Sequence, residues 1–172
     1  MKKITYVLFL AVLFFSVNQI DAQSKKAISI GGNLALPMGD FGDAASTGFG
    51  VTVTGELELA DKILGTATVG YLMWGEKSFG GYDFSYSAIP ILAGAKYYFQ
   101  NNFYAYGQLG FHLFSVDISP ESIYFDGDSE TEFTLGLGAG YEFNQFDITA
   151  MFYIISDANY LGIRAAYKIP LQ

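Results

Sequence analysis

The connections between apolar segments alternate in length along this chain, and this rhythm constrains the fold more than any other feature of the sequence. Segments of about ten residues, in which apolar and polar side chains alternate, are joined by connections that are short and long in turn. The short connections are residues 60–62, 100–102 and 144–145. The long connections are residues 37–48, 75–86, 116–131 and the reduced 156–159. Because antiparallel neighbours run in opposite directions, this rhythm predicts a sheet with all short turns at one rim and all long loops at the other.

Period-two alternation identifies the strands themselves. In the clearest segment, Val51 and Val53 share one face, while Thr52 and Thr54 share the other. No helical stripe competes with this period. The same pattern predicts eight strands, at residues 28–36, 49–59, 63–74, 87–99, 103–114, 132–143, 146–155 and 160–169.

Composition decides which face points outward. A soluble barrel hides its apolar face and covers the other face with charge, but only 15% of these residues are charged, against roughly 25% in ordinary soluble domains. The polar faces consist largely of Gly, Thr, Ser and Ala, which suit a crowded lumen. We therefore expect an all-β fold: an eight-stranded antiparallel transmembrane β-barrel with short periplasmic turns and long extracellular loops.

Aromatic residues gather at two levels of the predicted strands, one strand length apart. The group near the short turns is Tyr97, Phe99, Phe103, Tyr141, Phe143, Phe146 and Tyr167. The group near the long loops is Phe49, Tyr71, Trp74, Tyr86, Phe114, Phe133 and Phe152. Two such levels are typical of the girdles that mark the two membrane interfaces, so we expect both groups to face lipid. Aromatic residues of an ordinary core are the alternative.

The N-terminus is typical of an export signal. Lys2 and Lys3 precede the apolar run Ile4–Val17, which is too short to cross a bilayer as a helix. We expect a cleaved signal peptide over residues 1–22 and a single barrel domain over residues 23–172. Because the chain contains no cysteine, we expect neither a lipid-anchored cysteine at the cleavage site nor a disulfide framework.

The first expected hairpin carries a family resemblance. Residues 36–43 (LPMGDFGD), followed by residues 47–50 (TGFG), resemble the first hairpin of the small eight-stranded outer-membrane β-barrel domain proteins of the Bacteroidota type. These are similar in architecture to the OmpX and OmpA barrels. The resemblance covers the whole mature chain, but its motifs are structural and carry no catalytic signature. It implies the outer membrane of a Gram-negative bacterium as the location.

The same resemblance implies the partners of the chain. They are outer-membrane lipid, lipopolysaccharide and the outer-membrane insertion machinery. The family usually ends in an aromatic residue that this machinery reads, whereas this chain ends in YKIPLQ, residues 167–172. Nucleic acid is disfavoured as a partner, since phosphate binding needs clustered Lys and Arg and the formal net charge of the chain is −8.

Polar residues on the inward faces predict a network in the lumen. Its expected members are Glu56, Glu58, Lys96, Gln108, His112, Glu142, Asp147, Arg164 and Lys168. Charges in a narrow, low-dielectric lumen must pair or bind water. We expect the acids to pair with Lys96, Arg164 and Lys168 and so to hold the strands in register. A proton or ion path is the alternative, although eight strands leave an interior that side chains just fill.

His112 is the only histidine of the chain and the strongest candidate for catalysis. Outer-membrane lipid A deacylases place a His, a Ser and a Glu on the lipid-facing wall. Here the period of the strand turns His112 inward, position 114 is Phe, and Ser115 lies on the opposite face. A nucleophile and base within hydrogen-bond reach are therefore not expected.

The long loops are acidic. Their acids are Asp40, Asp43, Glu76, Asp83, Asp117, Glu121, Asp126, Asp128, Glu130 and Asp157, against the single base Lys77. Asp126, Asp128, Glu130 and Glu132 occupy alternate positions, a spacing that hard divalent cations such as Ca²⁺ can use. The full EF-hand loop pattern is missing, so a solvated acidic loop is the alternative to a metal site.

These observations favour a non-enzymatic outer-membrane protein with no cofactor, which has a structural, adhesive or envelope-protective role through its acidic extracellular loops. Two alternatives remain. One is a narrow OmpW-like channel for small solutes, which would require an open lumen. The other is a lipid A-modifying barrel enzyme, which would require a nucleophile, a base and an orienting group at the outer rim.

Overall fold

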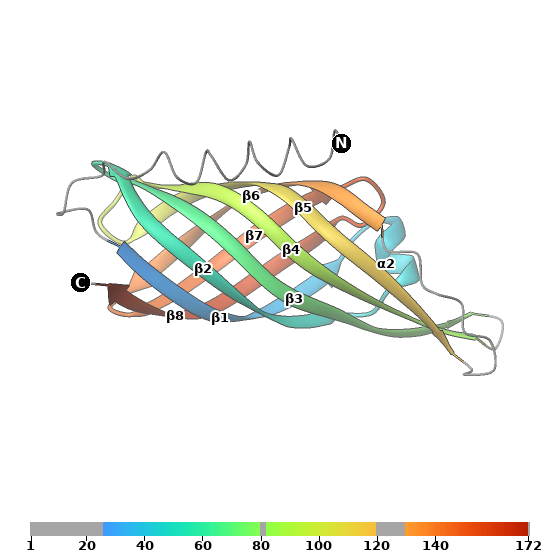
Figure 1. Cartoon of the computed structure of the whole chain (residues 1–172). Coiled ribbons are helices and arrows are strands. Elements are labelled where there is room, and N and C mark those ends of the chain that lie inside the picture. The colour runs from blue at the N-terminus through green and yellow to red at the C-terminus, as the bar shows by residue number, and fades with distance from the viewer. Residues whose placement is uncertain (1–25, 80–81, 120–129, 172) are drawn as a thin grey trace, which may run out of the picture.

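The chain forms a closed barrel of eight antiparallel strands that follow one another in chain order (Figure 1). The computed structural model describes residues 26–79, 82–119 and 130–171, and for residues 76–79, 82–84 and 117–119 it describes the backbone alone. The strands are β1 (Lys26–Pro37), β2 (Gly48–Ala60), β3 (Ile63–Phe79), β4 (Tyr82–Tyr98), β5 (Phe103–Ser119), β6 (Glu130–Phe143), β7 (Phe146–Ile155) and β8 (Tyr160–Leu171). Pairing of β1 with β8, from Lys26↔Leu171 to Pro37↔Tyr160, closes the barrel.

All eight predicted strands are present, so the fold class is confirmed. The largest extensions beyond the predicted ends are at the long-loop rim. There β3 and β4 extend through most of the expected long loop at residues 75–86, and β5 extends to Ser119, into the expected long loop at residues 116–131. The pairing of β3 with β4 reaches Phe79↔Tyr82. Alternation does continue there, with Tyr82, Phe84 and Tyr86 between polar residues, but the surrounding Gly, Asp and Ser are also typical of loops.

The long connection between β1 and β2 contains one element that the period-two pattern does not predict. Helix α2 spans Asp40–Ala44, and Phe41 is its one buried residue. None of the helices among the described residues is long and apolar enough to cross a membrane.

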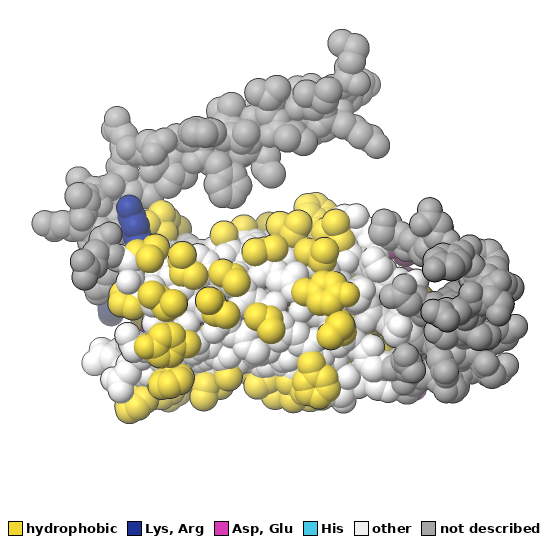
Figure 2. All heavy atoms as spheres, turned by 60° about the horizontal axis from the view of Figure 1, so that its bottom comes forward, with side chains coloured by type: hydrophobic (Ala, Val, Ile, Leu, Met, Phe, Trp, Pro, Cys, Tyr) yellow, Lys and Arg dark blue, Asp and Glu magenta, His cyan; other side chains and the backbone are white. Residues whose placement is uncertain are grey.

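The outer wall of the barrel is apolar. Figure 2 shows hydrophobic side chains spread over the barrel wall, and large ones are well exposed there, such as Val51 at 56% and Ile91 at 52%. The aromatic group near the short turns points outward throughout, as predicted; its members are Tyr97, Phe99, Phe103, Tyr141, Phe143, Phe146 and Tyr167. A wall of this kind requires lipid rather than water around it.

The second aromatic level is only partly as predicted. Phe49, Tyr71, Phe133 and Phe152 point outward. Trp74 and Phe114 are buried inside the barrel instead, and Tyr86 packs against them. The prediction was wrong for these three because it placed them by depth along the strand, whereas the period of two assigns them to the inward face.

Glycines on the inward faces make room for the large side chains that fill the lumen. A Cβ atom at Gly138 would lie 2.7 Å from the sulfur of Met151, and one at Gly140 would collide with the ring of Tyr104. The barrel interior is therefore a packed core, as expected for eight strands.

Candidate functional site

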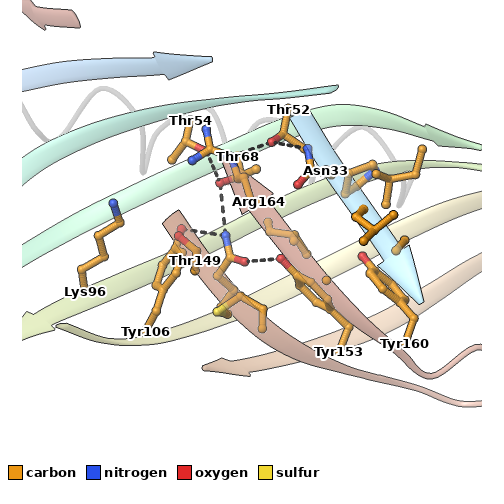
Figure 3. Close-up of a pocket in the computed structure, with 18 residues that line it drawn as sticks. Asn33, Thr52, Thr54, Thr68, Lys96, Tyr106, Thr149, Tyr153, Tyr160 and Arg164 are labelled. Carbon is orange, nitrogen blue, oxygen red and sulfur yellow. Dashed lines mark hydrogen bonds between the residues drawn. The ribbon is translucent and has the colours of Figure 1, made fainter. Parts of the chain in front are cut away.

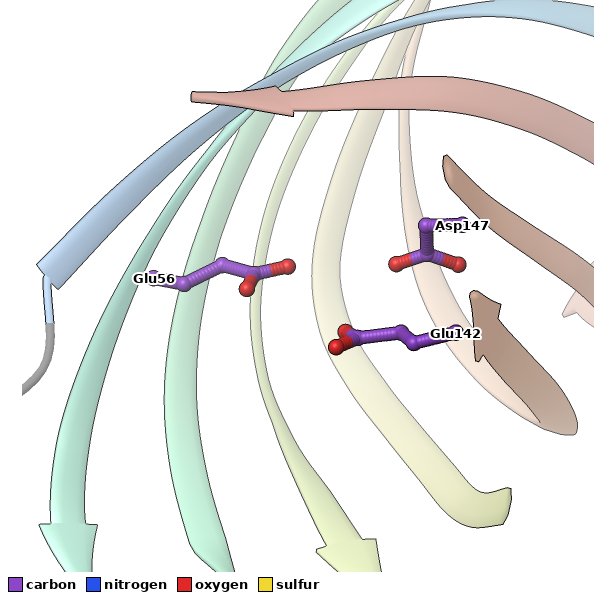
Figure 4. A group of neighbouring side chains, drawn as sticks. All are labelled: Glu56, Glu142 and Asp147. Atoms are coloured by element: carbon purple, nitrogen blue, oxygen red, sulfur yellow. The ribbon is translucent and has the colours of Figure 1, made fainter. Parts of the chain in front are cut away.

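A group of ion pairs fills the end of the lumen nearest the short turns. At its centre lies Lys96 of β4, whose side chain is 1% exposed. Its Nζ atom lies 2.6 Å from Glu56 Oε1 of β2 and 2.5 Å from Asp147 Oδ2 of β7. A third contact, of 3.2 Å, reaches Glu142 Oε1 of β6. Figure 4 shows the three carboxylates pointing toward one another from separate strands.

Lys168 of β8 adds a second ammonium group on the open side of these carboxylates. Its Nζ atom lies 2.8 Å from Glu56 Oε2 and 3.0 Å from Glu142 Oε2. The Lys168 side chain is 19% exposed, so it lies closer to solvent than Lys96. We call these five residues, Glu56, Lys96, Glu142, Asp147 and Lys168, the ion lattice.

Hydroxyl groups complete the hydrogen bonding of the ion lattice. Tyr104 Oη donates to Asp147 Oδ1 at 2.6 Å, and Thr149 Oγ1 donates to the same oxygen at 2.9 Å. Tyr98 Oη donates to Glu142 Oε1 at 2.6 Å. Buried charges persist only when they are paired and hydrogen-bonded. These contacts meet that requirement except at Glu56 Oε2, which has the ion pair with Lys168 but no hydrogen bond from the described residues.

The three carboxylates of the ion lattice also have the spacing of a metal site. One oxygen from each of Glu56, Glu142 and Asp147 lies within 4.8 Å of the others. Lys96 and Lys168, however, already direct their ammonium groups at these oxygens. The two lysines therefore supply the positive charge that a metal ion would otherwise bring.

The metal site predicted in the acidic loop lies largely outside the described residues. Asp126 and Asp128 belong to the part of the loop that the structure does not describe. Glu130 is exposed at the start of β6, and Glu132 is half-buried opposite His112 on β5. The metal site therefore stays a prediction.

Arg164 departs from the expected pairing. Its Nε atom donates to Thr52 Oγ1 at 2.9 Å, and its Nη2 atom donates to Ser29 Oγ at 2.9 Å. None of the ion pairs among the described residues includes Arg164, so the prediction that it pairs with a lumen carboxylate was wrong. The reason is its height in the barrel, since Arg164 precedes Lys168 by four residues on β8 and so lies nearer the long-loop end. Glu58 is half-buried and lines the mouth at the short-turn rim together with Lys168.

Gln108 organises the middle of the lumen. Its Nε2 atom donates to Tyr106 Oη at 2.8 Å and to Thr68 Oγ1 at 3.1 Å, while its Oε1 atom accepts from Tyr153 Oη at 2.9 Å. These side chains surround a cavity of about 30 Å³ (Figure 3). A cavity of this size holds about one water molecule, so the described side chains leave little free space at this level of the lumen.

His112 points into the lumen, as its position in the strand predicts. It is fully buried, and its two ring nitrogens lie 2.7 Å from Thr134 Oγ1 and 2.9 Å from Tyr160 Oη. Its ring stacks on Phe114 with 5.8 Å between centroids. Because Thr134 and Tyr160 are buried as well, a substrate at the lipid-facing wall would have no access to the imidazole.

An aromatic cluster closes the other end of the lumen, and sequence reasoning missed it. Phe41 of α2 inserts its ring from the long-loop side, 5.4 Å from Trp74, 5.6 Å from Tyr86 and 6.3 Å from Phe114, measured between ring centroids. Tyr160 lies 5.5 Å beyond Trp74. The one signal in the sequence was Phe41 itself, the single aromatic residue of the acidic loop at residues 37–48. We call Phe41, Trp74, Tyr86, Phe114 and Tyr160 the aromatic plug.

Comparisons with known proteins agree with this geometry. The crystal structure of Ail, the attachment invasion locus protein of Yersinia pestis, in complex with the heparin analogue sucrose octasulfate, is similar at a TM-score of 0.60 and 16% identity, over 85% of this chain and 99% of that chain. Neisserial surface protein A is similar at a TM-score of 0.54 and 13% identity, over 84% of this chain and 96% of that chain. At such identities the likeness shows the fold alone. No curated protein matches the sequence.

A family model covers nearly the whole chain. The model of the outer membrane protein beta-barrel domain matches residues 7–170. Members of this family reside in the outer membrane of Gram-negative bacteria, with short turns in the periplasm and long loops outside the cell. The aromatic plug is therefore at the extracellular end and the ion lattice at the periplasmic end. The chain belongs to the outer membrane β-barrel domain family.

Proposed function

We propose that the protein is a non-enzymatic outer-membrane protein whose extracellular surface has an adhesive, structural or envelope-protective role. The observation that carries the proposal is a sheet that projects beyond the extracellular rim (Figure 1). β4 and β5 stay paired as far as Asp83↔Ser119. The neighbouring strands do not extend as far, because β2 begins opposite Trp74 and β6 begins opposite Phe114.

The projecting sheet offers backbone groups as well as side chains. Along its two sides, the described residues of β2 and β6 supply no further pairing partner. Unpaired strand edges bind extended segments of other chains. Contact with an extracellular partner or with neighbouring envelope components is the role that this geometry supports best.

The charge of the extracellular surface limits the class of partner. Among the described side chains at this end, Asp40, Asp43, Glu130 and Asp157 are exposed acids. Ail is described in complex with a polysulfated heparin analogue, a ligand that requires clustered bases. An acidic surface repels such a ligand, so we propose a cationic partner or one bridged by divalent cations, including the phosphates of lipopolysaccharide.

A loop variant tests this proposal. Cells that display the protein are compared with cells in which Asp126, Asp128, Glu130 and Glu132 are changed together to Asn or Gln. The readout is binding to other cells or to lipopolysaccharide, with Ca²⁺ and with EDTA. We expect the variant to lose the Ca²⁺-dependent part of the binding, while His112→Ala keeps it. If His112→Ala abolished this binding and the loop variant did not, the enzyme alternative would replace this proposal.

The two alternative functions meet specific obstacles in the described residues. A channel for small solutes would need a passage through the aromatic plug, the central cavity and the ion lattice. A lipid A-modifying enzyme would need an exposed catalytic group, but His112 is buried. A lipid A hydrolysis assay on the refolded protein tests the second alternative, and we expect no hydrolysis.

Export and insertion form part of the proposal. We propose that a signal peptide over residues 1–22, which lies outside the described residues, is removed in the periplasm. The outer-membrane insertion machinery would then act on the exported barrel domain. The mass of the purified mature protein tests the cleavage site.

A further inference from the structure

The first extracellular loop, residues 38–47, places one large side chain, that of Phe41, inside the aromatic cluster of the barrel. Helix α2 has five residues, and its N-terminus lacks a side-chain hydrogen bond. A helix this short is not stable by itself. Backbone hydrogen bonds join the loop to its surroundings near both ends: Met38 N–H donates to Asn159 O at 2.8 Å, and Ser46 N–H donates to Gly75 O at 3.3 Å. Between these ends, Phe41 is the one buried residue of the helix.

Phe41 separates the extracellular solvent from the interior of the barrel. Its ring lies against Trp74, Tyr86 and Phe114, which come from three different strands. Tyr160 belongs to the same cluster and also lines the central cavity. Removal of the Phe41 ring would therefore expose the roof of that cavity to the outside.

Trp74 provides a second, independent observation at this place. The residue is 2% exposed, yet its Nε1–H group has no hydrogen-bond acceptor among the residues that the structure describes. A buried donor without an acceptor is unfavourable because it has lost its water. Water that enters when Phe41 leaves can accept this hydrogen bond. The arrangement with Phe41 inside therefore carries a free-energy penalty at Trp74 that the open arrangement removes.

We propose that residues 38–47 form a movable plug, in which Phe41 closes the extracellular mouth and leaves it transiently, admitting water and small solutes to the upper lumen. The ion lattice still closes the periplasmic end while the plug is out, so this motion does not create a through-channel. The proposal is independent of the adhesive role, because it concerns access to the lumen and not the projecting sheet.

Labelling of a single cysteine tests the plug. The chain has no cysteine of its own, and Ala88 of β4 is 1% exposed within the cluster beneath Phe41. The full-length Ala88→Cys protein, refolded in lipid vesicles, is treated with a membrane-impermeant thiol reagent. We expect slow labelling when Phe41 is present and labelling that is severalfold faster when Phe41→Ala is added. Asp157→Cys, at an exposed position, gives the labelling rate of a thiol that solvent reaches freely, for comparison.

Trp74 supplies a readout that needs no added cysteine, because it is the only tryptophan of the chain. We expect Phe41→Ala to shift its emission to longer wavelength and to increase quenching by acrylamide severalfold. Met38→Ala, at an exposed position of the same loop, should change neither value. Circular dichroism of each variant shows whether the barrel has formed.

Three results would overturn the proposal. Equal labelling of Ala88→Cys with and without Phe41 would mean that this ring is not the closure. Complete protection of the thiol in the protein that retains Phe41 would mean that the closure does not move. Unchanged Trp74 quenching in a folded Phe41→Ala protein would mean that other groups cover the pocket.

Discussion

At the scale of single residues, Lys96 contributes most to the electrostatics of the lumen, because three carboxylates depend on its ammonium group. Lys96→Met would leave Asp147 and Glu56 buried with less positive charge beside them. Removal of one partner from a buried ion pair costs about 3–5 kcal/mol. We expect a loss of that size in the free energy of unfolding, measured in urea with lipid or detergent present. Lys26→Met, at an exposed position, is the matched control, and an equal effect of both changes would contradict the role of the lattice.

Arg164 leads to a different expectation, because its partners are hydroxyl groups and a carbonyl. Arg164→Ala removes hydrogen bonds from a charged donor, which contribute about 1.5–3 kcal/mol, but it leaves no carboxylate without its cation. The loss of unfolding free energy should therefore be smaller than for Lys96→Met in the same urea titration. A larger loss would show that Arg164 does neutralise a lumen acid.

The period of two predicted which residues line the lumen but not which of them meet. Inward orientation of Glu56, Lys96 and His112 follows directly from the alternation, and the structure confirms it. Pairing depends on the height of each residue in a staggered barrel and on the reach of its side chain. Neither is visible in the sequence of one strand, so the expected partner of Arg164 was wrong.

At the scale of strands, the inward glycines determine how closely side chains pack across the barrel. Gly140 on β6 faces Tyr104, whose hydroxyl is held by Asp147 and Thr149 and so cannot yield. Overpacking of a well-filled core costs about 1–3 kcal/mol, and we expect Gly140→Ala to lose this much in the same unfolding measurement. Gly32→Ala is the control, since its Cβ would meet nothing within 4 Å. Equal stability of the two variants would contradict this packing.

Strands were predicted well and other elements were not, for a physical reason. A half-buried strand shows its alternation directly in the sequence, because one face meets lipid and the other meets the lumen. Helix α2 is too short to show a helical period, and its burial depends on Phe41 meeting side chains that are distant in the sequence, such as Trp74 and Phe114. The projecting ends of β3 to β5 have no lipid beside them to impose a clear pattern.

At the scale of the whole molecule, the topology predicts which connections a protease can reach. Lys62 lies exposed in the short turn between β2 and β3, which faces the periplasm. Trypsin added to intact cells should therefore leave the bond after Lys62 uncut, and the same bond should be cut once the outer membrane is permeabilised. Mass spectrometry of the fragments distinguishes the two cases. Cleavage after Lys62 in unbroken cells would show that the barrel has the opposite orientation, with its short turns outside the cell.

The central claim is that side chains of the described residues close this barrel at three levels, which supports the proposed role at its surface rather than in transport. The aromatic plug, the filled middle of the lumen and the ion lattice each block the passage of ions. The most direct test is the conductance of the refolded full-length protein in a planar lipid bilayer. We predict no stable conductance steps in the wild-type protein or in Phe41→Ala, because the ion lattice remains. Steady, ion-selective conductance steps in the wild-type protein would contradict the closure of the lumen and favour the alternative function as a channel for small solutes.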